Sequence, residues 1–301
     1  MPDTERAAEI VESESTILET VRAAAEELRS FANRLVFRGV LATSGVAAVL
    51  LHRLLPERHP ILPDHGTLWD LAKLQSHALA RLCGIAVTVQ GRERLSGGPY
   101  VFVANHQSYL DLVVLLAFLP GRIRFLVTEE MAQHAFWGPI FRALEMVSVD
   151  ADAETPEAIV EGLERMTTDG SVLVFPEGRR SPTTCLLPFS DLPFMAVVGL
   201  GLPVVPVAIH GTRSVMPAAS ERGIVPGEVR VIVEEPIPTA HLIAEDYHPL
   251  REDVRALIAR QVEEVGSLLG MGADPDDLRE ERDVGASLPE GFVPVGHAVH
   301  A

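Results

Sequence analysis

Cysteine is scarce in this chain of 301 residues, which contains only Cys83 and Cys185. Two cysteines form at most one disulfide bond, which excludes a small secreted scaffold held by disulfides and a zinc site made of four cysteines. The first twenty residues contain seven acidic or basic side chains and no apolar core of a secretory signal peptide. We therefore expect the protein to work in the reducing environment of the cytoplasm.

Basic side chains are also few. The chain has 25 Lys and Arg residues against 42 Asp and Glu residues, a formal charge of −17. Nucleic-acid binding depends on neutralising phosphates, so this balance argues against DNA or RNA as a partner. The acid is concentrated at the ends: residues 1–33 carry eight acidic and three basic side chains, and residues 271–301 carry seven and two. Apolar residues make up 47% of the chain, enough for a sizeable buried core.

The N-terminal region lacks an apolar segment long enough to cross a bilayer. Residues 39–51 form a run of thirteen residues without a charge, flanked by Arg38 and Arg53. As a helix this run spans roughly 20 Å, short of the roughly 30 Å hydrocarbon core. It either belongs to the protein core or lies in the membrane interface with the two arginines at headgroup level.

An apolar stripe precedes this run. Apolar residues recur at spacings of four and three, which is typical of one face of an amphipathic helix. These residues are Ile17, Val21, Ala24, Leu28, Phe31 and Leu35. We expect the helix to dock on its own domain. The alternatives are a helix lying on a membrane and a short coiled coil, which would make the protein an oligomer, although the repeat stops short of three heptads.

Short β-rich runs alternate with helical runs between about residues 68 and 235. The expected strands are residues 85–90, 100–104, 123–128, 146–149, 171–175, 204–209 and 229–234, and the expected helices include 108–119, 138–144, 155–167 and 249–269. This alternation predicts a single α/β domain with a central mixed sheet flanked by helices and preceded by N-terminal helices. We place a helical region at 1–67, the α/β domain at 68–270, and an acidic flexible tail at 271–301.

The segment 105–111, which reads NHQSYLD, follows an expected strand and opens an expected helix. His106 should lie in the turn and Asp111 in the first helical turns, with Ser108 as the N-cap. A carboxylate bound to one imidazole nitrogen fixes the tautomer and leaves the other nitrogen to accept a proton from a hydroxyl. Free backbone N–H groups at the helix start could face developing negative charge. The simpler interpretation is that His106 caps the helix and Asp111 neutralises the helix dipole.

A second segment, 175–181, reads FPEGRRS and also follows an expected strand. Gly178 allows close approach of the backbone to a ligand, Glu177 can bind a polyol hydroxyl, and Arg179 with Arg180 suits a phosphate or carboxylate. The alternative is a turn with surface charges. In the apolar run 204–209, Pro206 indicates a special bend, because proline is unfavourable inside a sheet.

Together and in this order, NHQSYLD, FPEGRRS and the run VPVAI at 205–209 closely resemble the PlsC-like glycerolipid acyltransferase family, over about residues 68–240. The resemblance implies transfer of a fatty acyl group from acyl-CoA or acyl carrier protein to the hydroxyl of lysophosphatidic acid or a related lysoglycerolipid. It implies that His106 is the general base, that Asp111 orients it, and that no metal or bound cofactor is needed. The acceptor would be held by Asn105, Ser108, Glu177, Gly178, Arg179 and Arg180. A lipid substrate favours peripheral or monotopic association with a membrane surface through residues 37–55.

The sequence departs from the family pattern where positive charge is usual. Ala151 follows Asp150 where the family usually has an arginine, Thr128 or Glu129 stands in place of a lysine, and Arg179 replaces a threonine. We therefore expect retained chemistry with an altered acceptor pocket, so that the acceptor is another lysoglycerolipid rather than lysophosphatidic acid. The rival functions are a non-catalytic lipid-binding or regulatory relative, and a thioesterase.

Overall fold

The computed structural model describes residues 18–33, 35–36, 66–128, 132–134, 137–149, 156–167, 170–216 and 224–268, together with Thr16 and Gly39. Residues 40–65 and 269–301 lie outside the described part. The predictions for the uncharged run and for the acidic tail therefore stay predictions.

Within the described residues, seven strands form one sheet in the order β1-β7-β6-β2-β5-β3-β4. Their bounds are β1 Ile85–Gln90, β2 Val101–Ala104, β3 Ile123–Thr128, β4 Val147–Val149, β5 Ser171–Val174, β6 Val204–His210 and β7 Gly227–Val233. Neighbouring strands run parallel except for the antiparallel pair β6 and β7. The predicted mixed α/β sheet is thus confirmed.

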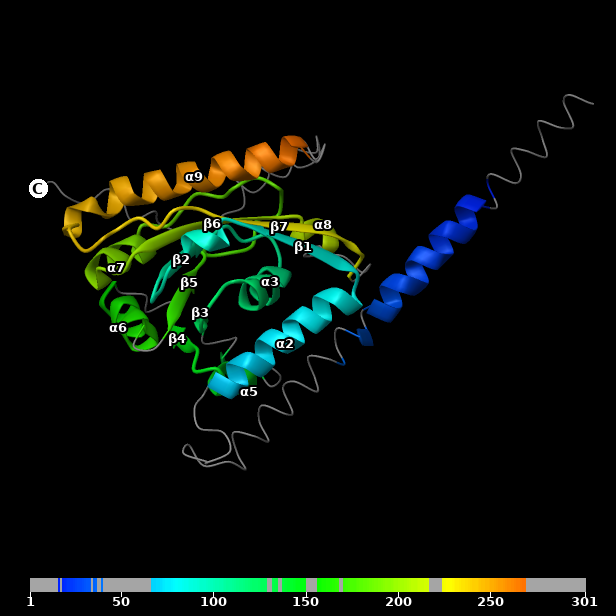
Figure 1. Ribbon diagram of the computed structural model, residues 1–301, viewed down its shortest axis with the longest axis horizontal. Coiled ribbons are helices and arrows are strands. Elements are labelled where there is room, and N and C mark those ends of the chain that lie inside the picture. Colours follow the sequence, from blue (N-terminus) through cyan, green and yellow to red (C-terminus); the bar gives the residue numbers. More distant parts are fainter. Residues whose placement is uncertain are drawn as a thin grey trace, which may run out of the picture.

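Helices cover both faces of the sheet (Figure 1). The helices α2 Gly66–Leu82, α3 Leu110–Phe118 and α5 Trp137–Ala143 contribute to one apolar cluster, and α6 Pro156–Thr167, α7 Leu192–Leu200 and α9 Tyr247–Leu268 contribute to the other. Strand β2 serves both clusters, because successive side chains of a strand point to opposite faces: Phe102 faces the first and Val103 the second. All four residues of β2 are buried, so the strand that leads into NHQSYLD lies at the centre of the core.

The strand predictions agree with the structure to within two residues at each end. Three helices, α2, α7 and the four-residue α8 Thr212–Val215, were not among the expected ones. The residues of α7, LPFMAVVGL, contain no charged side chain, because the helix is buried against α6 and α9. A helix that is apolar all round has no 3.6-residue periodicity to detect.

We expected the N-terminal helix to dock on its own domain through its apolar stripe. The structure shows otherwise. Residues 18–33 are helical, and four of the stripe residues are 52–69% exposed: Val21, Leu28, Phe31 and Leu35. Contact with the α/β domain comes from the end of the helix, where the Asn33 amide donates to the Ile224 carbonyl oxygen at 3.1 Å. Figure 1 shows this helix in blue, projecting away from the sheet. Of the helices in the described ranges, none combines the length and apolarity needed to cross a bilayer.

Candidate active site

The NHQSYLD segment forms a tight hydrogen-bonded loop between β2 and α3. Asp111 lies in the first turn of α3 with its side chain 0% exposed. One of its carboxylate oxygens, Oδ2, accepts three bonds: from His106 Nδ1 at 2.8 Å, and from the backbone N–H groups of Gln107 and Ser108 at 2.7 and 2.9 Å. Because an ionised carboxylate only accepts, the proton on the imidazole is assigned to Nδ1. The interaction predicted between His106 and Asp111 is therefore present in the structure.

The His106 imidazole has one nitrogen bound and the other available. With Nδ1 held by Asp111, Nε2 is left as the nitrogen with a lone pair. The ring stacks on Phe175 with centroids 4.1 Å apart, and the side chain is 14% exposed. The imidazole thus has its orientation set on one edge and one face, while some of its surface remains open to a substrate.

Ser108 caps the start of α3, as predicted. The helix begins at Leu110, and Tyr109, which directly precedes it, makes no side-chain capping bond. The Leu110 N–H donates to Ser108 Oγ, and the Asp111 N–H donates to the Ser108 carbonyl oxygen. Since Asp111 also takes the Gln107 and Ser108 N–H groups, these four amides are occupied and do not form the oxyanion site that we expected.

The two motifs meet at the backbone of His106. The Glu177 carboxylate accepts the His106 N–H through Oε1 at 2.7 Å, and the Ser181 N–H donates to the His106 carbonyl oxygen at 2.7 Å. The other Glu177 oxygen, Oε2, accepts the Leu187 N–H at 3.0 Å. Burial raises the pKa of Glu177 to about 7, against the lowering effect of its two backbone hydrogen bonds. The structure thus places Glu177 against the backbone, whereas the sequence suggested a contact with the acceptor.

Arg180 supplies positive charge beside the NHQSYLD loop. Its guanidinium carbon lies 3.8 Å from the centroid of the Tyr109 ring, a cation–π contact. Its Nη1 atom is buried and has no hydrogen-bond partner within the described part of the chain. Buried polar groups are normally hydrogen-bonded, so this donor suits an anionic oxygen of a bound ligand.

The neighbouring residues Gly178 and Arg179 are both exposed. Gly178 has φ +68°, and a Cβ atom built there would meet nothing within 4 Å. Glycine is therefore favoured at this position by the left-handed backbone conformation, and not by a lack of room for a side chain. Arg179 remains accessible to a charged ligand.

Asn105 and Ser108 are buried positioning residues. Asn105 is 1% exposed, donates to the Ile209 carbonyl oxygen at 2.9 Å and accepts the Ile209 N–H at 2.8 Å. Ser108 is 0% exposed, and its hydroxyl donates to the Met216 carbonyl oxygen at 2.7 Å. Both side chains tie the NHQSYLD loop to β6 and to Met216, which follows α8 Thr212–Val215. Their predicted contact with substrate stays a prediction.

Phe175 and Tyr109 were not among the residues predicted to form the site. The structure places each of them against a motif side chain, Phe175 on His106 and Tyr109 under Arg180. The signal available in the sequence is an aromatic residue inside each motif. That signal is weak by itself, because aromatic side chains are common in cores.

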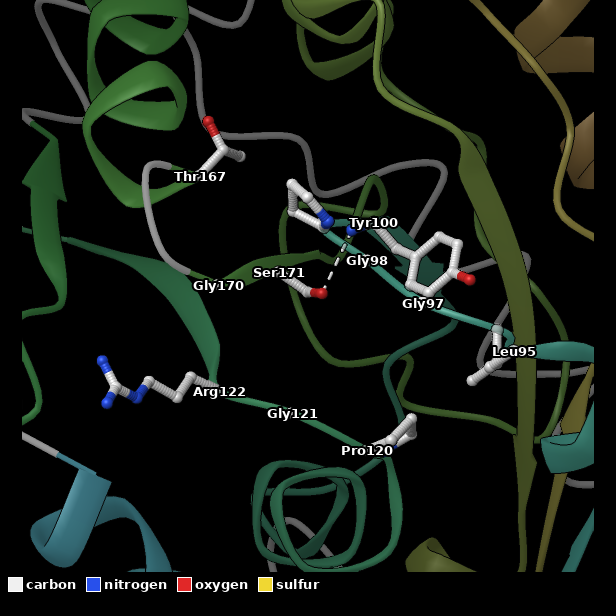
Figure 2. Close-up of a pocket in the computed structure, with 11 residues that line it drawn as sticks. Leu95, Gly97, Gly98, Tyr100, Pro120, Gly121, Arg122, Thr167, Gly170 and Ser171 are labelled. Atoms are coloured by element: carbon white, nitrogen blue, oxygen red, sulfur yellow. Dashed lines mark hydrogen bonds between the residues drawn. The ribbon is translucent and has the colours of Figure 1, made fainter.

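A cavity of about 420 Å³ lies elsewhere, at the amino ends of β2 and β5. Its lining includes Tyr100, Arg122 and Ser171, and Ser171 Oγ accepts the Tyr100 N–H at 3.1 Å (Figure 2). His106 and Glu177 follow the carboxyl ends of the same two strands. The cavity is therefore separate from the candidate site. Across the described ranges, no group of three His, Cys, Asp or Glu side chains is placed to hold a metal ion.

Comparisons with known proteins find acyltransferases. The acyltransferase family profile matches residues 86–210, which include all the motif residues. The chain is 33% identical over 210 residues to the chloroplastic 1-acyl-sn-glycerol-3-phosphate acyltransferase BAT2 of Brassica napus, covering 64% of this chain and 58% of that protein. It is also 33% identical over 186 residues to human 1-acyl-sn-glycerol-3-phosphate acyltransferase alpha, covering 58% of this chain and 62% of the human protein. The chain thus spans less than two thirds of each of these two relatives.

A solved structure shows the same architecture. The crystal structure of the 1-acyl-sn-glycerophosphate acyltransferase PlsC from Thermotoga maritima superposes with a TM-score of 0.67 at 25% identity, covering 81% of this chain and 98% of that chain. The resemblance drawn from the motifs is thereby confirmed: residues 86–210 match the acyltransferase family, and the chain is similar in sequence and in fold to 1-acyl-sn-glycerol-3-phosphate acyltransferases.

Proposed function

We propose that the protein transfers a fatty acyl group from an acyl thioester to the hydroxyl of lysophosphatidic acid or a related lysoglycerolipid. The observation that carries this proposal is the His106 imidazole, bound at Nδ1 by the buried Asp111 carboxylate and left with a basic Nε2. The names of the relatives support a glycerolipid acceptor that bears a phosphate. Acyl-CoA and acyl carrier protein are the candidate donors.

The reaction needs one base and no covalent enzyme intermediate. The acceptor hydroxyl donates its proton to His106 Nε2 as its oxygen attacks the thioester carbonyl carbon. The carbon–sulfur bond then breaks, and the leaving thiolate takes the proton back from the imidazolium. Asp111 stabilises the imidazolium in between, since the carboxylate is 2.8 Å from Nδ1. The products are an ester, which carries the transferred acyl group, and a free thiol, which carries the proton from the acceptor hydroxyl.

The acceptor headgroup is proposed to bind at Arg180. This arginine has a buried, unpartnered Nη1 atom, and Arg179 beside it is exposed. Position 151, where the family usually has an arginine, is an alanine and lies outside the described residues. Each charge-assisted hydrogen bond contributes about 1.5–3 kcal/mol. We therefore retain the hypothesis that lysophosphatidic acid is not the strongly preferred acceptor.

An acceptor panel tests the reaction and the acceptor together. Purified protein is given a labelled acyl thioester with lysophosphatidic acid or with other lysoglycerolipids, and both free thiol and acylated lipid are measured. We expect thiol release that depends on the acceptor, with a neutral or zwitterionic lysolipid used at least as well as lysophosphatidic acid. A strong preference for lysophosphatidic acid contradicts the altered pocket. Thiol release without an acceptor identifies a thioesterase, and no release with any acceptor indicates a non-catalytic relative.

Arg180→Gln is expected to weaken binding of a phosphate-bearing acceptor. Losing one charge-assisted bond of about 1.5–3 kcal/mol corresponds to an increase in KM of about 10- to 100-fold, with a smaller change in kcat. The measurement is steady-state kinetics with varied acceptor at saturating thioester. Arg92→Gln is the matched control, because Arg92 is exposed and lies in the short helix Arg92–Arg94 that follows β1. An unchanged acceptor KM in Arg180→Gln would remove Arg180 from the headgroup site.

A further inference from the structure

Glu177 lies between two loops, with its carboxylate turned inward and the residue 9% exposed. One oxygen binds the N–H of His106 and the other binds the N–H of Leu187. We infer that Glu177 is a positioning residue whose ionised carboxylate bridges these two amides and thereby sets where His106 meets the acceptor hydroxyl. The inference deepens the proposed function and rests on His106 being the base.

The backbone of His106 is held on both sides. Glu177 accepts its N–H, and the N–H of Ser181 donates to its carbonyl oxygen. Asp111 then holds the ring at Nδ1. With both peptide groups and the ring edge restrained, the imidazole has little freedom left, and the position of Nε2 depends on all three contacts. Placement within a fraction of an ångström matters for a reacting atom.

Only a carboxylate completes this bridge. Two N–H groups need two acceptors, and an ionised carboxyl supplies one oxygen to each. A glutamine of the same shape offers one oxygen and one NH₂ group, so one of the two amides would face a donor. A buried N–H that loses its acceptor is unfavourable, and the loop is expected to shift to relieve it.

The bridge depends on protonation. The charged groups near Glu177 are Asp111 of α3 and Arg255 of α9, and the imidazole of His106 belongs to the loop that Glu177 holds. Burial and Asp111 raise the pKa of Glu177, whereas the two amides and Arg255 lower it, and the result is about 7. Above this pH the carboxylate accepts from both amides. As the pH falls through about 7, one oxygen becomes a donor and one amide loses its acceptor.

Amide NMR on the full chain tests the bridge directly. In a His106→Ala variant the imidazole is gone, but the backbone N–H at position 106 remains, so its titration reports on Glu177. We expect the amide protons of position 106 and Leu187 to shift together, with one midpoint near pH 7. Adding Glu177→Gln to this variant should abolish both shifts, and Glu245→Gln, an exposed carboxylate in the short helix Ala244–Asp246, should leave them intact. Amides that do not titrate, or that titrate with different midpoints, overturn the bridge.

Kinetics separates positioning from contact with the acceptor. Glu177→Gln is expected to lower kcat by about 10- to 100-fold with the acceptor KM changed less than about threefold, because the lost interaction acts on the base. Glu245→Gln should change neither. A raised KM with unchanged kcat would instead make Glu177 an acceptor contact and overturn the inference.

The two experiments also separate the inference from the proposed function. Shared titration of both amides without acylation of any lysolipid would leave the bridge in place and refute the function. Acylation without that titration would support the proposed function and refute the bridge. Because the titration uses a variant that retains Glu177, it decides the question even if Glu177→Gln fails to fold.

Discussion

His106→Ala is expected to reduce acyl transfer by about 10²- to 10⁴-fold, which is the range that a positioned general base contributes. The loss should appear in kcat, because the imidazole acts on the proton as the acceptor hydroxyl attacks the thioester. The measurement is thiol release and lipid acylation at saturating acceptor and donor. The thermal unfolding temperature should change little, because the imidazole is partly exposed and its backbone contacts remain.

His241→Ala is the matched control for this experiment, because His241 is exposed and lies between β7 and α9. It removes the same side chain without touching the candidate site. Unchanged turnover in His106→Ala would remove the catalytic assignment altogether. Equal losses in both variants would show that the effect does not come from the candidate site.

Asp111→Asn is expected to lower kcat by about 10²-fold or more while the fold is kept. The asparagine oxygen can take the place of Oδ2 and still accept from His106 Nδ1 and from the Gln107 and Ser108 amides. What is lost is the negative charge that stabilises the imidazolium formed during proton transfer. The rate should be recorded across pH at 25 °C, together with the unfolding temperature.

The same variant distinguishes catalysis from helix capping. The new NH₂ group falls at the position of Oδ1, which is buried and has no partner among the described residues, so a stability loss of about 1–3 kcal/mol is expected. If Asp111 only caps α3, the stability loss should occur with near-normal turnover in the folded protein. Asp253→Asn, on the exposed side of α9, provides the control for loss of one negative charge.

The sheet could be predicted from the sequence because its strands are short apolar runs separated by turn residues. Strands β1 and β3 have the predicted bounds, 85–90 and 123–128. The helix α7 could not be predicted in this way, because burial between α6 and α9 removed the polar face that a helical periodicity needs. The N-terminal helix shows the opposite problem. Its periodicity predicted the helix, but periodicity does not identify what covers the apolar face.

The pairing of His106 with Asp111 was determined by the sequence alone, because the two residues lie five apart on one turn that connects a buried strand to a helix. The roles of Asn105 and Glu177 were decided only by the tertiary structure. Glu177 binds an amide 71 residues away, and Asn105 binds one 104 residues away. Every residue except proline carries the same backbone N–H, so residue type cannot identify which amide a buried polar side chain will bind. The packing of β2, β5 and β6 side by side determines which amides these two side chains meet, and it holds His106 in place.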